Sequence, residues 1–129
     1  MSFLNGTTQI PFSGSTQGQP IKVVATATPG TLIHTTGTPL YTTQYDKIYL
    51  RLVNTSAADV LATVEFGGTT SPDNTIPVNV PAQGGVVVAI DGEQLSGNGS
   101  AGLNVRVFAA SANVVLALGF VARVTPLSA

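Results

Sequence analysis

Apolar and polar residues alternate with a period of two along most of this chain from residue 21 onward. Residues 46–54 and 58–66 show the alternation most clearly. A period of two is typical of a β-strand with one buried face. Clusters of glycine, proline and asparagine separate the alternating segments, as expected for turns. The pattern predicts eight strands, at residues 21–27, 31–36, 46–54, 58–66, 75–80, 86–90, 103–109 and 113–124.

The number and spacing of these strands predict the fold class. No helical period lasts longer than one turn, and a chain of 129 residues fits a single domain. We therefore expect an all-β, single-domain β-sandwich, most simply a jelly roll of about eight antiparallel strands. The sandwich would span residues 21–124, between an extended N-terminal arm at 1–20 and a C-terminal tail at 125–129. An immunoglobulin-like strand order is an open alternative.

Three local details of the sheets can be predicted. The short connection at 54–57 suggests that strands 46–54 and 58–66 form a hairpin with their apolar faces on the same side. That register places Leu52 opposite Val60, and Lys47 opposite Glu65. Pro77 cannot donate a backbone hydrogen bond, so its strand is expected at the edge of a sheet. The strands at 103–109 and 113–124 are expected to form a final hairpin.

Two strands are apolar on both faces, namely residues 86–90 and 114–124. A strand in an isolated antiparallel sheet commonly has one face in water. The second apolar face must therefore be covered by a loop, by the arm or by another subunit. Because only 9% of the residues are charged, we favour another subunit. Candidate assembly contacts on these strands are Val87, Ala89, Val115, Ala117 and Val121.

The first 20 residues are rich in glycine, serine and glutamine and are interrupted by Pro11 and Pro20. Such a segment is expected to be disordered when free, or to become ordered by docking. Its apolar residues are candidate anchors onto a neighbour, or they cover the edge of the chain's own sandwich. These anchors are Phe3, Leu4, Ile10 and Phe12. If they bind a neighbour, removing residues 1–20 should leave the sandwich folded but abolish binding to that neighbour.

Composition excludes several classes of function. The chain has no cysteine, so disulfides and thiolate metal sites are excluded. Its net charge is −1 and its five basic residues are scattered, so we expect no nucleic-acid partner. The N-terminus lacks the regions of a signal peptide, and no apolar stretch reaches the roughly 18 residues of a membrane helix. We therefore expect neither a secretory leader nor a membrane partner.

The residues that commonly perform catalysis are sparse. His34 is the only histidine, and it has no nucleophile motif around it, so we expect a histidine on the surface or at an interface. The six carboxylates lack the spacing of a metal site. The loop that begins at Gly67 lacks the lysine and helix of a phosphate loop. We therefore predict no enzymatic activity, no catalytic residues, no metal and no cofactor.

Tyr41 and Tyr45 form the one candidate surface patch outside the apolar strands. Sugar-binding sandwiches use exposed aromatic rings as stacking platforms, and this chain contains no tryptophan. These tyrosines are therefore candidates for a carbohydrate or receptor contact. Packing in the core, or a contact between subunits, is the alternative interpretation.

Several segments together carry a resemblance to a class of viral proteins. The segments are YDKIYLRLVNTS at 45–56, VEFGGTTSPDN at 64–74, IPV at 76–78, VPAQ at 80–83 and VRVFA at 105–109. In style and in order of elements, residues 31–124 resemble the small β-rich virion proteins of tailed bacteriophages, including capsid cement or decoration proteins. The resemblance implies a structural protein, often trimeric, that binds the major capsid protein and stabilises the head. It also implies synthesis in the host cytoplasm, location on the capsid surface and no catalytic residues.

Other functions are kept as alternatives to the cement protein. A phage tail, fibre or adaptor component would have the same composition and would be found with tails instead of heads. A carbohydrate-binding module would use Tyr41 and Tyr45 as its platform, and its binding would be lost on Tyr41→Ala. A small enzyme is the class that the sequence favours least.

Overall fold

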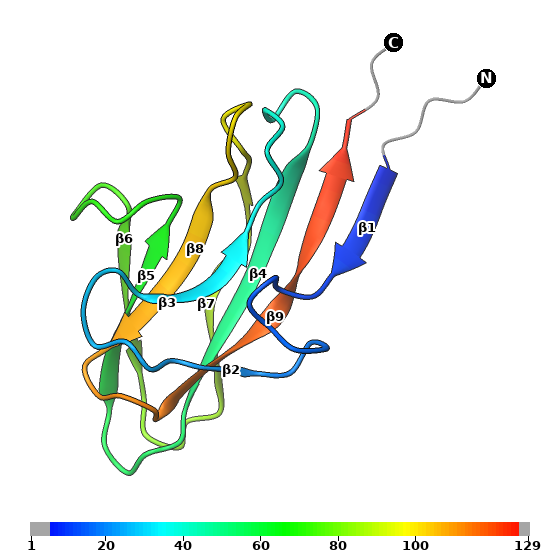
Figure 1. The fold of residues 1–129 in the computed structure, drawn as a ribbon. Coiled ribbons are helices and arrows are strands. Elements are labelled where there is room, and N and C mark those ends of the chain that lie inside the picture. The colour runs from blue at the N-terminus through cyan, green and yellow to red at the C-terminus, as the bar shows by residue number, and fades with distance from the viewer. Residues whose placement is uncertain (1–5, 127–129) are drawn as a thin grey trace.

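The computed structural model describes residues 6–126 and places them in nine β-strands, with no helix in that range (Figure 1). The all-β prediction is therefore confirmed, with one strand more than expected. The strands are β1 (Gly6–Ile10), β2 (Ile21–Lys22), β3 (Thr31–Thr35), β4 (Tyr45–Asn54), β5 (Val60–Phe66), β6 (Thr75–Val80), β7 (Val86–Leu95), β8 (Asn104–Ala109) and β9 (Val115–Thr125). No helix in residues 6–126 is long and apolar enough to cross a membrane.

The strands form two antiparallel sheets. A five-stranded sheet has the order β1-β9-β4-β7, with β2 also paired to β9, and a four-stranded sheet has the order β3-β8-β5-β6. From β2 onward, every connection passes from one sheet to the other except the β5–β6 turn. Pro77 lies in β6, which is an edge strand as predicted.

Both sheets contribute to one apolar core. Alternate residues of β4 and β5 are buried, as the period of two predicts. The predicted hairpin between these strands is wrong, however, because β4 and β5 lie in different sheets. Leu52 pairs with Val87 and Ala117, whereas Val60 pairs with Val80. Two strands that face each other across a core show the same alternation as two strands that pair side by side.

The expected final hairpin is wrong for the same reason. β8 pairs with β3 and β5 in the four-stranded sheet, whereas β9 pairs with β1, β2 and β4 in the five-stranded sheet. Lys47 and Glu65, expected to be opposite each other, likewise belong to different sheets. The short connections at 54–60 and 109–115 pass over the end of the core instead of forming a tight turn between neighbours.

The N-terminal segment is part of the fold from residue 6 onward. β1 pairs with β9 from Gly6 opposite Thr125 to Ile10 opposite Val121, so the two ends of the described chain lie side by side (Figure 1). Phe12 is only 2% exposed and belongs to the core. Of the two alternatives for this segment, anchoring onto a neighbour or covering the chain's own sandwich, the second holds for Ile10 and Phe12, which pack on the chain's own core. Phe3 and Leu4 lie outside the described residues.

Gly119 allows β9 to lie close to β4 near the middle of this pair of strands. Its φ of +143° is rare for residues with a side chain, and a Cβ there would overlap the carbonyl oxygen of Tyr49. Gly119→Ala is therefore expected to destabilise the fold by about 1–3 kcal/mol, through backbone strain and displacement of β4. Chemical denaturation would measure the loss. Gly6→Ala is the matched control, because a Cβ at Gly6 meets nothing within 4 Å.

Candidate functional site

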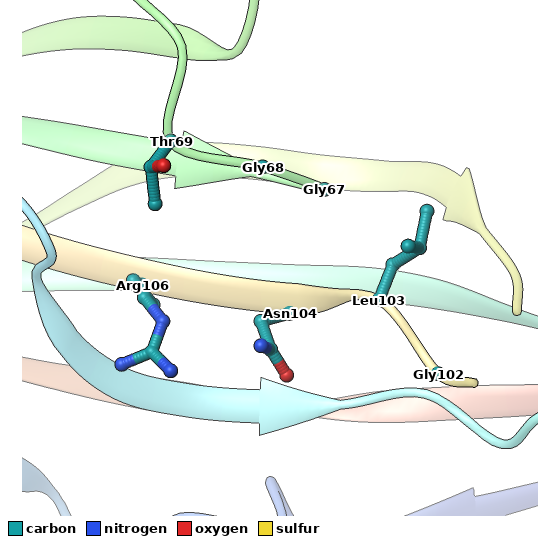
Figure 2. Close-up of a pocket in the computed structure, with 7 residues that line it drawn as sticks. All are labelled: Gly67, Gly68, Thr69, Gly102, Leu103, Asn104 and Arg106. Carbon is teal, nitrogen blue, oxygen red and sulfur yellow. The ribbon is translucent and has the colours of Figure 1, made fainter.

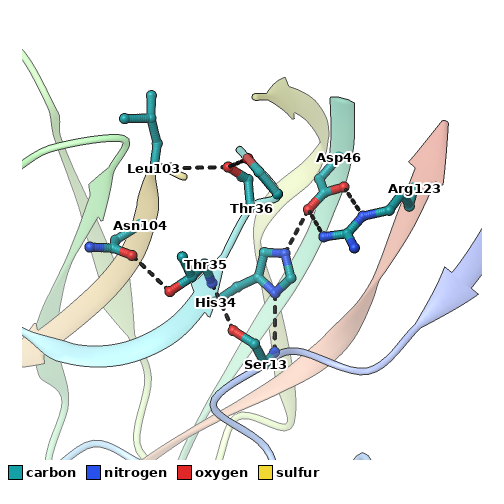
Figure 3. Close-up of polar contacts among 9 residues, drawn as sticks. Ser13, His34, Thr35, Thr36, Asp46, Leu103, Asn104 and Arg123 are labelled. Carbon is teal, nitrogen blue, oxygen red and sulfur yellow. Dashed lines mark hydrogen bonds and ion pairs between the residues drawn. The ribbon is translucent and has the colours of Figure 1, made fainter. Parts of the chain in front are cut away.

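A polar cluster with a buried centre joins the N-terminal segment to both sheets (Figure 3). At its centre the carboxylate of Asp46 in β4 lies 2.7 Å from Nε2 of His34 in β3. Arg123 in β9 donates to both Asp46 oxygens, at 2.8 Å and 3.0 Å. The backbone N–H of Ser13 donates to Nδ1 of His34 at 3.1 Å. The cluster therefore connects four separate segments of the chain.

The hydrogen bonds fix the roles of the groups in this cluster. Because Nδ1 of His34 accepts from a backbone N–H, its Nε2 carries the proton and donates to Asp46. Burial alone would raise the pKa of Asp46, but hydrogen bonds from His34 and Arg123, with the charge of Arg123, lower that pKa below its ordinary value. The hydrogen bond to Asp46 raises the pKa of Arg123. Asp46 and Arg123 are thus held as an ion pair.

The cluster contains a serine, a histidine and an aspartate, but not in a catalytic arrangement. A nucleophilic serine must give its hydroxyl proton to the histidine. Here the Ser13 hydroxyl oxygen instead accepts a hydrogen bond from the Thr35 backbone at 2.7 Å, and both ring nitrogens of His34 already have partners. The expectation of a surface or interface histidine is wrong, because His34 is buried. This geometry suits a structural role that positions the N-terminal segment.

The outward apolar residues of β4, β7 and β9 form a continuous outer face, in which Val86 and Val88 are exposed and the others are partly exposed. Val53 of β4 lies between Val86 of β7 and Leu116 of β9. In the next outward row, Arg51 lies between Val88 and Leu118. We define the β4–β7–β9 face as the outward side chains of Tyr49, Arg51, Val53, Val86, Val88, Leu116, Leu118 and Phe120.

This face has the composition of a protein interface. Val88 is 59% exposed, and the rings of Tyr49 and Phe120 stack with centroids 4.8 Å apart. A shallow pocket of about 150 Å³ lies between this aromatic pair, Val88 and Asp91. Aromatic residues and arginine are enriched at interfaces, and contiguous exposed apolar patches mark sites of association. The β4–β7–β9 face is therefore the candidate functional site.

The structure corrects which residues of β7 and β9 face outward. Val115, Ala117 and Val121, which were candidate assembly contacts, are fully buried in the chain's own core, as is Phe12. Val87 and Ala89 are partly buried and pack against that core. The alternate residues face outward, because register with β4 turns Val87 toward the core beside Leu52. In a strand that is apolar on both faces, the sequence pattern alone does not identify the inner one.

Tyr41 and Tyr45, the other predicted contacts, differ in their surroundings. Tyr41 is largely exposed in the loop between β3 and β4, and Tyr45 is half-buried as the first residue of β4. The aromatic pair that the structure brings together is Tyr49 and Phe120. The sequence signal for that pair was weak, because Tyr49 and Phe120 lie 71 positions apart and their strands become neighbours only in the folded sheet.

A small pocket of about 100 Å³ lies between the glycine loop after β5 and the start of β8 (Figure 2). Arg106 lines it, but its guanidinium points away from Gly67 and Gly68 and donates to the Gly30 carbonyl oxygen at 3.0 Å. The Gly67 N–H donates to the Asn104 carbonyl oxygen. These contacts do not direct a charge and backbone donors at a common point, which a phosphate site requires.

A larger pocket of about 240 Å³ lies on the outer side of the four-stranded sheet. Glu65 is buried at its base, where its two oxygens accept from the Gly30 N–H at 2.6 Å and from the Thr28 hydroxyl at 2.5 Å. The other residues that line the pocket carry hydroxyl groups or are apolar, namely Thr63, Thr69, Ser71, Thr75, Pro77 and Phe108.

Comparison with protein-family models, curated proteins and solved structures finds no match to this chain. Within residues 6–126, no group of three or more histidine, aspartate or glutamate side chains is placed to hold a metal ion.

Proposed function

We propose that this chain is a structural virion protein, most specifically a capsid cement or decoration protein, which assembles through the β4–β7–β9 face. The observation that carries the proposal is the exposed apolar surface of that face, with Val86 and Val88 more than half exposed and Arg51 among them. With only 9% charged residues, a monomer has few means of keeping such a surface soluble. The proposed partners are other copies of the chain, as a homotrimer, and the major capsid protein.

The order of the strands supports a finer description of the fold as a β-sandwich of the jelly-roll type. In a jelly roll, eight strands form two four-stranded sheets, and most successive connections pass between the sheets. With β1 and β2 taken as one interrupted edge strand, the orders β1-β9-β4-β7 and β3-β8-β5-β6 fit that description. Viral capsid proteins and lectins both use this architecture, so the fold is compatible with the proposal.

A pair of matched substitutions tests the proposed interface. Val88→Asp places a charge on the β4–β7–β9 face, and Leu61→Asp places one on the outer side of the four-stranded sheet. Both positions are similarly exposed, at 59% and 52%, so neither change should unfold the monomer. We expect Val88→Asp to dissociate the oligomer on a sizing column and Leu61→Asp to leave it intact. Equal behaviour of the two variants would contradict the assignment of the interface.

The location in the virion needs a separate experiment. A cement protein should bind purified phage heads, whereas a tail, fibre or adaptor component should co-purify with tails. Val88→Asp should reduce head binding more than Leu61→Asp if oligomerisation positions the chain on the shell. Binding to tails alone would replace the cement proposal by the tail proposal while keeping the assembly surface.

A further inference from the structure

Most of the polar groups that line the pocket above Glu65 are hydroxyls. Five of its eight lining residues carry hydroxyl groups, namely Thr28, Thr63, Thr69, Ser71 and Thr75. None of the eight is a lysine or an arginine, and the carboxylate at the base disfavours an anion. A hydroxyl group both donates and accepts hydrogen bonds, so the lining suits a neutral ligand with several hydroxyl groups.

Thr28 is oriented by the buried carboxylate. Its hydroxyl donates to Glu65, so the lone pairs of its oxygen remain available to accept from a ligand. A hydroxyl that already donates to a carboxylate is a stronger acceptor, because hydrogen bonds in a chain polarise one another. The Gly30 N–H holds the other Glu65 oxygen at 2.6 Å and fixes the carboxylate in place. The pocket thus presents a preorganised acceptor to a hydroxyl donor.

The apolar part of the lining and the volume narrow the ligand further. Phe108 of β8 is half-buried and Pro77 of β6 is exposed, and β5 separates the two strands. The C–H groups of a sugar ring can pack on such surfaces while its hydroxyls reach the threonines. Pockets for drug-sized ligands are typically about 300–1,000 Å³. At about 240 Å³, this pocket is suited to a single ring.

We propose that this pocket binds one neutral sugar ring, either a free monosaccharide or the terminal residue of a glycan. This inference does not depend on the oligomeric state, because the pocket lies on the four-stranded sheet and the β4–β7–β9 face lies on the other. It also places the sugar site away from Tyr41 and Tyr45.

NMR titration of the full chain tests the proposal directly. The probes are glucose, galactose, mannose and N-acetylglucosamine, each as the free sugar and as the methyl glycoside. We expect at least one probe to shift the backbone amide signals of Thr28, Thr63 and Thr69, with a dissociation constant in the millimolar range. Binding of the methyl glycoside would indicate the end of a glycan, and binding of the free sugar alone would indicate a monosaccharide.

Three variants separate this pocket from the tyrosine patch. Thr63→Val removes a hydroxyl at nearly constant volume, and Phe108→Leu removes the ring while keeping an apolar side chain. Each should weaken sugar binding at least threefold, whereas Tyr41→Ala should leave binding unchanged. The proposal would be overturned if none of the sugars shifts the pocket amides, or if the shifts map to Tyr41. Because Glu65 is a carboxylate, tetramethylammonium serves as the probe for a cationic ligand. Tighter binding of tetramethylammonium than of every sugar would overturn the choice of a neutral ligand.

Discussion

Replacing Phe12 by alanine is expected to lower the free energy of unfolding by about 3–5 kcal/mol. The ring is 2% exposed and lies with its centroid 6.0 Å from that of the buried His34. Its removal leaves a cavity between β3 and β9, because Phe12 also approaches Gly119. Urea denaturation followed by circular dichroism would measure the change. Tyr41→Ala, at an exposed position, is the control and should alter stability by less than about 0.5 kcal/mol.

Removal of residues 1–20 should lower the free energy of unfolding by more than Phe12→Ala does. The deletion takes away β1 and the Phe12 side chain, and it also removes the two hydrogen bonds between Ser13 and β3. The expectation that the remaining chain folds normally without this segment is therefore reversed. A truncated chain with native stability would show that the N-terminal segment contributes little to the core.

Asp46→Ala is expected to lower the free energy of unfolding by about 3 kcal/mol. Removing one partner of a buried ion pair typically costs about 3–5 kcal/mol, because the remaining group is left without a partner. Here His34 would lose its acceptor, and Arg123 would lose two hydrogen bonds. The lower end of the range applies because Arg123 is 29% exposed and can be hydrated. Denaturation at neutral pH measures the loss, and a change below about 0.5 kcal/mol would contradict it.

The same carboxylate predicts a dependence of stability on acid. The folded-state pKa of Asp46 is lowered, so its contribution is fully present above the unfolded-state pKa of about 3.9. The contribution is lost as the pH falls through the lower folded-state pKa. The stability difference between the natural chain and Asp46→Asn should therefore shrink as the pH is lowered below about 4. A constant difference across that range would show that ionisation of Asp46 does not stabilise the fold.

The sequence pattern predicted the strands better than it predicted their pairing. The range 75–80 agrees with β6, and the edge position of Pro77 follows from its missing N–H. The β4–β5 hairpin was wrong because alternation reports only that one face is buried. It does not report whether the next strand lies beside the first or across the core.

The sequence pattern predicted that β7 and β9 carry apolar residues on both faces, but not which residues face outward. That these strands form an assembly surface stays a prediction. Only the register of β9 with β4 shows that Val115 and every second residue after it face the core. The polar cluster could not be predicted, because Ser13, His34, Asp46 and Arg123 are far apart in the sequence and meet only when both sheets have formed. The pocket above Glu65 likewise combines residues of two loops and three strands, and Glu65 itself lies on one of those strands.

The mass of the purified chain in solution tests the central claim most directly. Light scattering on a sizing column, over a range of protein concentrations, would report it without any assumption about the partner. Assembly through the β4–β7–β9 face predicts a trimer of three 13.1 kDa chains. A mass of 13.1 kDa at every concentration would contradict self-assembly through this face.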